Sequence, residues 1–346
     1  MATRGVAAAR AELLAQADRP ALTEDLGESL VSALRLALPV DGWCVIGFDP
    51  VSGLRSMMYS RNGVADASSL ARNEFVDADL NRYVDLARRP IPVGIISQDD
   101  PDAPHSIRLR EILRPAGFTS EMRVALQTGG VLWGALALFR SDSVAPFGHS
   151  DTRAAAELVS PIANAIRRYT VRHTDKPTDP LPTGVMIVDA LDTVISSTTA
   201  ADDCVGELMA GGDDEMSRDD ILRIVFDATA RARHTPAGQP AVAVIRGHSG
   251  RWLAINAAPL HPSDRTGDVA VTLGPAGPSQ VLPAFARWHG LTSREHAVLR
   301  LLADGLSTRL IARHLDVSMF TAEDHLRAIY RKTVSSGRSQ LIASLM

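Results

Sequence analysis

The chain has 346 residues, a hydrophobic content of 45%, a charged content of 22% and a formal net charge of −4. This length accommodates two or three domains with separate cores, and the composition is ordinary for a globular protein. No stretch approaches the roughly 18 uninterrupted apolar residues of a membrane helix, and the first residues lack the apolar segment of a secretory signal. We therefore expect a cytoplasmic protein that does not enter membranes.

The first block of the sequence predicts helices followed by a mixed sheet. A Gly-Gly pair between two apolar, β-rich runs is a specific hairpin signal. The predicted elements are, in order, helical sequence to about residue 38 with a break at 19–20, strands at 42–49 and 54–60, helix-prone segments at 80–88 and 105–113, hairpin strands on both sides of 129–130, and a long helix over 150–171.

This order resembles a GAF domain, most closely where VLWGALALFR is followed by SDSVAPFGHSDTRAAAELVSPIANAI. The resemblance covers roughly residues 20–172, and we assign 1–172 to the N-terminal helices and this domain. The block is rich in aromatic and methionine side chains, which either line a small-molecule pocket or are simply core. The candidate ligand-binding residues are Trp43, Met57, Tyr59, Phe75 and Trp133.

The second block begins after a segment at 173–182 that contains three prolines and no apolar periodicity, which indicates a linker. The sequence then predicts strands at 184–189 and 193–197, helices at 199–209 and 219–233 around a polar Gly-Asp loop, and three closing strands, AVAVIRG, GRWLAINAAPL and DVAVTLG. This order resembles a shortened PAS domain, which we assign to 183–275. A second linker is expected at 275–283.

The third block, 285–346, predicts three or four short helices. Thr292 or Ser293 can cap the first of them, which Gly305 ends. Ser307 can cap the second, and Ser318 can cap a third helix that runs to about Lys332. Two short helices joined by a tight turn, the second with a charged face, suit the major groove of B-DNA.

These residues resemble the LuxR-type helix-turn-helix domain. The likeness lies in LTSRE, LLADGLS, IARHL and a T-x-x-x-H-x-x-x-I-x-x-K pattern, followed by Arg338 and Leu341 where that family has an Arg and a Leu. Two departures are Ala322, where a valine is usual, and a permuted turn at 333–337. The fold class expected for the whole chain is therefore multidomain α+β with an all-α C-terminal domain.

The third helix of this domain has a charged face that could read DNA. Glu323, Arg327 and Arg331 lie at i, i+4 and i+8, with Asp324 beside them. Spacing alone equally fits a solvated ladder of ion pairs, but the family resemblance implies base contacts for Glu323, Asp324 and Arg327. It implies phosphate contacts for Thr321, Arg331, Lys332 and Arg338.

Charge and missing motifs support the same interpretation. From residue 285 onward, eight Arg and one Lys against five Asp and Glu give +4, so the remainder of the chain carries −8. A basic unit on an acidic body suits contact with a polyanion through one part only, although +4 is modest. The sequence has no HExxH, GxSxG, GxxxxGK[ST] or GxGxxG motif and no CxxC pair, so we expect no metal, no cofactor and no enzymatic activity.

The sequence thus predicts a bacterial transcription regulator that binds double-stranded DNA as a homodimer under the control of a small-molecule effector, with RNA polymerase as a further candidate partner. One alternative is a constitutive regulator whose GAF-like and PAS-like domains serve only as dimerisation scaffolds. Another is a signalling protein with regulated enzymatic output. A sensor should gain thermal stability from a ligand, whereas a scaffold should dimerise and gain none.

Overall fold

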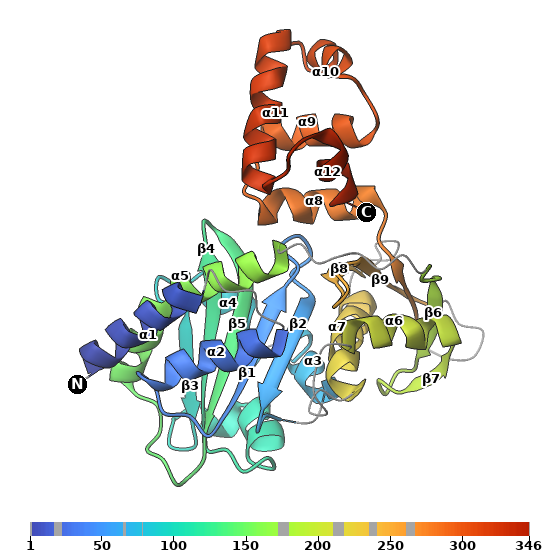
Figure 1. Cartoon of the computed structure of the whole chain (residues 1–346). Helices are drawn as coiled ribbons and strands as arrows, with labels where there is room; N and C mark the ends of the chain where they lie inside the picture. Colours follow the sequence, from blue (N-terminus) through green and yellow to red (C-terminus); the bar gives the residue numbers. More distant parts are fainter. Residues whose placement is uncertain are drawn as a thin grey trace.

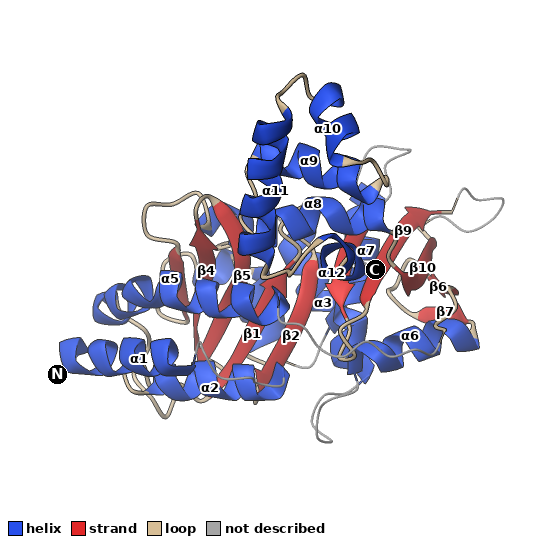
Figure 2. Cartoon of the chain, turned by 45° about the horizontal axis from the view of Figure 1, so that its top comes forward, coloured by secondary structure: helices blue, strands red, loops and turns tan. Residues whose placement is uncertain are grey.

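The computed structural model describes residues 2–16, 23–64, 67–77, 79–171, 180–209, 218–234, 241–260 and 267–345. The described residues form two antiparallel sheets with their covering helices and one all-helical unit (Figures 1 and 2). This arrangement confirms the predicted multidomain α+β class. Among the described residues, none of the helices combines the length and apolarity of a membrane-spanning segment.

The first sheet has the strand order β2-β1-β5-β4-β3. Its domain contains, in chain order, α1 Ala2–Gln16, α2 Thr23–Arg35, β1 Gly42–Phe48, β2 Arg55–Arg61, α3 Ala67–Phe75, α4 Tyr83–Leu86, β3 Val93–Ser97, the 3-10 turn η1 Ala103–His105, the π-helical η2 Arg108–Leu113, β4 Ser120–Thr128, β5 Val131–Arg140 and α5 His149–Val171.

Both faces of this sheet are covered. Helices α1, α2 and α5 lie on one face, and α3, α4 and η2 lie on the other (Figure 1). Strand β4 shows the alternation, because Met122 and Val124 join the core beneath α5, whereas Ala125 joins the core on the opposite face. Glu121 and Arg123 alternate with them and are also buried, so this second face carries buried charge.

The middle of this domain differs from the sequence prediction. The segment 80–88 forms only the short α4, and 105–113 ends in a π-helix. Strand β3 was not predicted at all, because its residues follow Pro90 and Pro92 and the strand lies at the edge of the sheet. The expected break at 19–20 lies outside the described residues.

The second sheet has the order β7-β6-β10-β9-β8, so its strands are arranged as in the first sheet, counted from the start of each domain. The predicted strands and helices are present as β6 Gly184–Val188, β7 Val194–Ser197, α6 Thr199–Met209, α7 Arg218–His234, β8 Ala241–Arg246, β9 Trp252–Pro259 and β10 Val269–Pro275. The Gly-Asp loop and most of the first predicted linker lie outside the described residues.

The C-terminal unit consists of α8 Pro278–Trp288, α9 Ser293–Ala303, α10 Thr308–His314, α11 Met319–Thr333 and α12 Arg338–Ala343. Helix α8 starts inside the segment expected to be a linker, so that prediction was wrong. Pro278 stands in the first turn, where a missing N–H costs nothing, and Val281, Phe285 and Trp288 bury one side of the helix.

Helix α8 lies between the C-terminal helices and both sheet domains (Figure 1). The indole rings of Trp252 in β9 and Trp288 in α8 are stacked, with centroids 4.8 Å apart and planes 9° from parallel. Nε1 of Trp252 donates to the carbonyl of Ser344 at 2.9 Å, and Nε of Arg167 in α5 donates to the carbonyl of Trp288 at 2.5 Å. The C-terminal unit is therefore packed against the rest of the molecule.

Candidate nucleic-acid interface

Side-chain caps fix the starts of α9, α10 and α11. The Oγ1 of Thr292 accepts from the backbone N–H of Glu295 at 3.2 Å, while the Glu295 carboxylate accepts from the backbone N–H of Thr292 at 2.6 Å. Ser307 accepts from Leu310 N–H at the start of α10, and Ser318 accepts from the N–H of the third residue of α11. The three caps predicted from the sequence are confirmed.

A tight turn joins α10 to α11. Asp316 adopts φ 52°, a left-handed conformation that Asp tolerates, and the N–H of Val317 donates to the carbonyl of Ala312 at 3.0 Å. Leu326 and Ile329 of α11 then face a common apolar core with α9 and α10. The inward side of α11 is therefore used for packing, which leaves the opposite side to solvent.

The outward side of α11 carries the predicted base-contacting residues. Glu323, Asp324 and Arg327 are exposed, as is Arg331 one turn further on. The Arg327 guanidinium pairs with Asp324 at 2.9 Å and with Glu323 at 3.7 Å, so the ion-pair ladder is present in the free protein. Exposed pairs of this kind contribute little, ~0.3–0.5 kcal/mol each, and can be exchanged for base contacts. Thr321, at the start of the helix, is half-buried beside its capping serine.

Lys332 and Arg338 are occupied inside the domain. The Nζ of Lys332 donates to the Glu295 carboxylate at 2.6 Å and to the carbonyl of Gly290 at 3.1 Å. Burial alone would raise the pKa of Glu295, but hydrogen bonds from Lys332 and Thr292 outweigh it and lower that pKa. These contacts tie α11 to α9, a structural role different from the predicted phosphate contact.

Arg338 binds the C-terminal end of α9. Its Nη1 donates to the carbonyl of Leu306 at 2.8 Å and its Nη2 to the carbonyl of Leu302 at 3.2 Å. A cation here adds hydrogen bonds to carbonyls at and just beyond the end of α9 and interacts favourably with the helix dipole. Like Lys332, this residue stabilises the domain from within.

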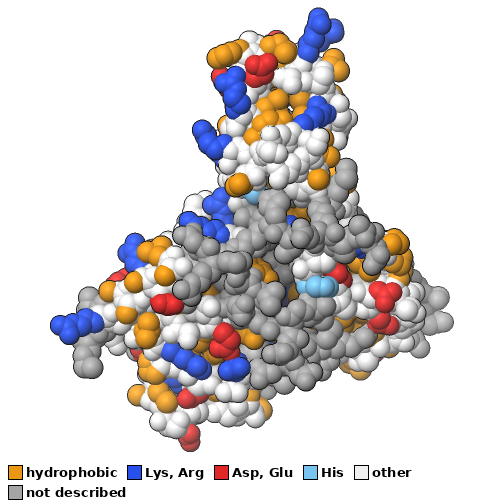
Figure 3. Space-filling model, in the orientation of Figure 1, with side chains coloured by type: hydrophobic (Ala, Val, Ile, Leu, Met, Phe, Trp, Pro, Cys, Tyr) orange, Lys and Arg blue, Asp and Glu red, His pale blue; other side chains and the backbone are white. Residues whose placement is uncertain are grey.

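Other side chains of this surface were missed from the sequence. Exposed arginines of α9 and α10 are Arg294, Arg300, Arg309 and Arg313. Figure 3 shows cationic side chains at several places around the C-terminal unit. Met319 and Phe320, at the start of α11, are 44% and 67% exposed. Their helical position was readable from the cap at Ser318, but their exposure depends on the packing of α10.

Comparison with known proteins identifies two parts of the chain. Residues 289–345 match the bacterial regulatory proteins of the luxR family, and residues 22–166 match the GAF domain. The C-terminal unit is a LuxR-type helix-turn-helix domain. The N-terminal unit is a GAF domain. Both family resemblances predicted from the sequence, to the LuxR-type domain and to the GAF domain, are confirmed.

The LuxR-type domain also matches a curated regulator. Over 53 residues the chain is 40% identical to the monoamine regulon transcriptional regulator of Klebsiella aerogenes, which corresponds to 15% of this chain and 23% of that protein. The chain thus matches about a quarter of the length of this relative.

Among solved structures, the chain is similar to VqmA bound to DPO, with 23% identity, coverage of 47% of this chain and 84% of that chain, and a TM-score of 0.23. It is also similar to the Vibrio cholerae VqmA dimer without target DNA, with 20% identity, coverage of 47% and 81%, and a TM-score of 0.23.

Four of the five candidate ligand residues of the GAF domain share one packed core, and the fifth, Phe75, lies elsewhere. Trp43, Tyr59 and Trp133 are buried in the core beneath the α1, α2 and α5 layer, with Met57 packed against it. Phe75 instead packs against the core of the second domain. A cavity on the opposite face of the sheet is lined by none of the five. No group of three or more potential metal-ligating side chains occurs among the described residues.

Proposed function

We propose that the protein is a transcription regulator that binds double-stranded DNA by inserting α11 into the major groove. The observation that carries this proposal is the LuxR-type domain whose charged face, Glu323, Asp324 and Arg327, is exposed while the opposite face is packed. Arg can donate two hydrogen bonds to guanine, and carboxylates can accept from cytosine. The exposed Arg294, Arg331 and their neighbours supply the phosphate contacts.

The body of the molecule would control this domain. We assign a sensory role to the GAF domain and a PAS-like fold to residues 183–275, which the five-stranded antiparallel sheet with two helices supports. We further propose that the protein acts in the cytoplasm as a homodimer that binds two half-sites and contacts RNA polymerase. It would carry out no catalytic step of its own.

A constitutive regulator with scaffold domains is the competing function. It is favoured by one observation, namely that Trp43, Tyr59 and Trp133 are closely packed core residues instead of cavity walls. The sensor is favoured by the cavity on the other face of the same sheet, whose mainly apolar walls also carry arginines. The two functions differ in whether a small molecule stabilises the protein and changes its DNA affinity.

The proposal is tested by selecting duplexes from a random library with the full-length protein and measuring their binding by fluorescence anisotropy. Affinity should fall linearly with the logarithm of salt concentration, with a slope of ~0.9 per phosphate contact. Arg331→Ala should lower that slope by about one, whereas Arg89→Ala, an exposed change in the GAF domain, should leave it unchanged. Folded protein that enriches no duplex and shows no salt-sensitive binding contradicts the assignment.

A further inference from the structure

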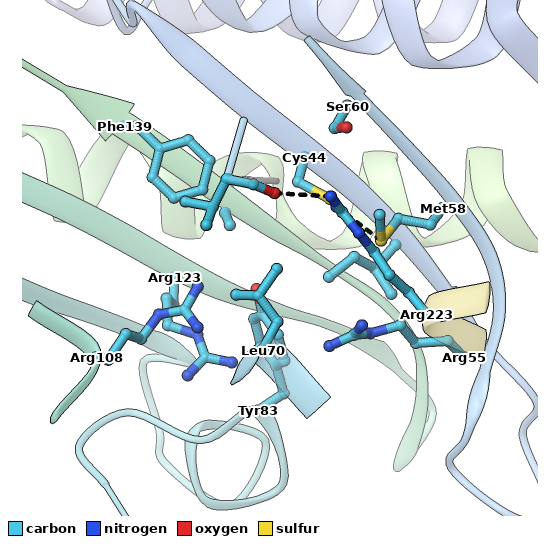
Figure 4. A pocket seen from close by; sticks show the side chains of 13 residues that line it. Cys44, Arg55, Met58, Ser60, Leu70, Tyr83, Arg108, Arg123, Phe139 and Arg223 are labelled. Carbon is cyan, nitrogen blue, oxygen red and sulfur yellow. Dashed lines mark hydrogen bonds between the residues drawn. The ribbon is translucent and has the colours of Figure 1, made fainter. Parts of the chain in front are cut away.

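One cavity of the GAF domain is walled by arginines from four separate elements. It has a volume of ≈ 20 Å³ and lies between the first sheet, α3, α4 and η2, with α7 of the second domain closing it. Arg55 comes from β2, Arg108 from η2, Arg123 from β4 and Arg223 from α7. Figure 4 shows Arg55 and Arg223 approaching from one side and Arg108 and Arg123 from the other, with Leu70 and Tyr83 between them.

These guanidinium groups differ in how far their donors are used. Arg108 uses two nitrogens on one partner, since its Nε and Nη2 both donate to the Glu121 carboxylate at 2.6 Å. Arg123 pairs with Glu74 through Nη2 only, and its Nε and Nη1 are buried without a hydrogen-bond partner. Its guanidinium lies over the ring of Tyr83, 3.9 Å from the centroid, which leaves the N–H edge unused.

Arg55 leaves a further donor unused. Its Nε lies 3.1 Å from the Asp227 carboxylate, but its Nη1 is buried without a partner. The Arg55 side chain is 5% exposed and that of Arg123 is 3% exposed. Burying an N–H of a charged group without a partner is costly, and such groups in native proteins usually have a partner, be it protein, water or a bound ion.

We propose that this cavity binds the carboxylate of a small organic acid between Arg55 and Arg123. A carboxylate presents two oxygens with several lone pairs, which match the unused N–H groups of two guanidinium forks. One water molecule needs ~10–15 Å³ of such space, so ≈ 20 Å³ accommodates a group slightly larger than water. Tyr83 and Leu70 supply the apolar walls. This assignment of a ligand class rests on the sensory role proposed above and extends it.

The second domain completes this site. Arg223 lines the cavity from α7, where its Nη2 donates to the carbonyl of Val64 at 2.8 Å, and Asp227 one turn later holds Arg55. A carboxylate bound at Arg55 therefore alters the environment of an ion pair that joins the two domains. Occupancy would favour one arrangement of α7 against the first sheet, since a ligand shifts an equilibrium by its differential affinity for the two states.

The test measures the melting temperature of the full-length protein in sodium acetate, with sodium chloride at equal ionic strength as the reference. Acetate should give a saturable rise that follows ligand-binding linkage. The double variant Arg55→Lys/Arg123→Lys keeps every charge and both carboxylate pairings but loses the free donors, so the half-saturating acetate concentration should increase about tenfold or more. Arg233→Lys is the matched control, because Arg233 also lies on α7 and binds Asp192, away from the cavity.

Equal effects of acetate and chloride, or an unchanged acetate response in a folded double variant, overturn the proposal. Should the double variant fail to fold, the single Arg55→Lys variant gives the same comparison. The affinity for a selected duplex is then measured with and without acetate. If acetate binds but the affinity for DNA does not change, the carboxylate site is supported and its sensory role is refuted. If the protein binds DNA but does not respond to acetate, the proposed regulator is supported and the carboxylate site is refuted.

Discussion

Arg338 separates a structural role from a DNA-contacting one, and replacing it with alanine tests which of the two it performs. The change removes two hydrogen bonds, to the carbonyls of Leu306 at 2.8 Å and Leu302 at 3.2 Å. Hydrogen bonds from charged groups contribute ~1.5–3 kcal/mol each. Because Arg338 is half-buried and water can replace part of the loss, we expect about 1.5–3 kcal/mol for the pair together.

This loss should be confined to the end of α9 and the start of α12. Each 1.4 kcal/mol corresponds to a factor of ten, so hydrogen exchange of amides in 299–311 should accelerate roughly 10- to 150-fold. Hydrogen-exchange mass spectrometry of the full-length protein measures this directly. Arg331→Ala is the control, because the Arg331 side chain is exposed and its loss should not change exchange in this segment.

The opposite result would refute the reasoning. If Arg338→Ala left exchange in 299–311 unchanged while lowering the salt slope of DNA binding by about one, Arg338 would be a phosphate contact, as the family resemblance implies. The helix-end contacts would then be exchanged for DNA on binding. Accelerated exchange with an unchanged slope supports the structural role.

Three further predictions concern single side chains. Arg327→Ala should cost ~1–3 kcal/mol on the selected duplex, less the ~0.3–0.5 kcal/mol of its exposed pair with Asp324, and should relax preference at particular base pairs in a repeated selection. Burial raises the pKa of Asp227 from 3.8 to about 7, so the folded protein keeps a proton that the unfolded chain releases. The free energy of unfolding should therefore fall as the pH rises from about 4 to about 7. Asp227→Asn should flatten that fall in denaturant titrations repeated across this range, and an unchanged profile would contradict it. The pKa of Glu295 is lowered, so the stability that its carboxylate contributes is present above pH 4.5 and is lost as the pH falls. Glu295→Gln breaks the ion pair with Lys332 and should cost ~0.5–2 kcal/mol of stability at pH 7. Thermal melts of this variant should no longer show the loss of stability at low pH.

Local signals in the sequence gave accurate predictions. Thr292, Ser307 and Ser318 cap their helices through contacts within three residues, so their roles follow from spacing alone. The Gly-Gly turn at 129–130 likewise joins β4 to β5, with both glycines at positive φ. In these cases the residues that determine a helix start or a turn lie within that helix start or turn.

Non-local features could not be predicted in this way. The role of Arg338 depends on carbonyls more than thirty residues away in sequence, at Leu302 and Leu306. The arginine-lined cavity of the GAF domain gathers side chains from β2, η2, β4 and α7, of which only η2 and β4 follow each other in the chain. One signal was available: Glu121 and Arg123 alternate with apolar residues in a strand that lies between two covered faces, where charge needs partners.

The stacked indoles of Trp252 and Trp288 have a geometric consequence for the DNA that this protein recognises. They hold α8, and with it the recognition helix α11, which we propose enters the major groove, in a fixed relation to the second sheet. In a pair of chains, the distance between the two recognition helices is then set by how the bodies associate and not by the reach of a loose tether. A flexible tether tolerates changes in the distance between half-sites, whereas a fixed one does not. Inserting five base pairs between half-sites, which turns one of them to the other side of the duplex, should therefore abolish paired binding instead of weakening it gradually.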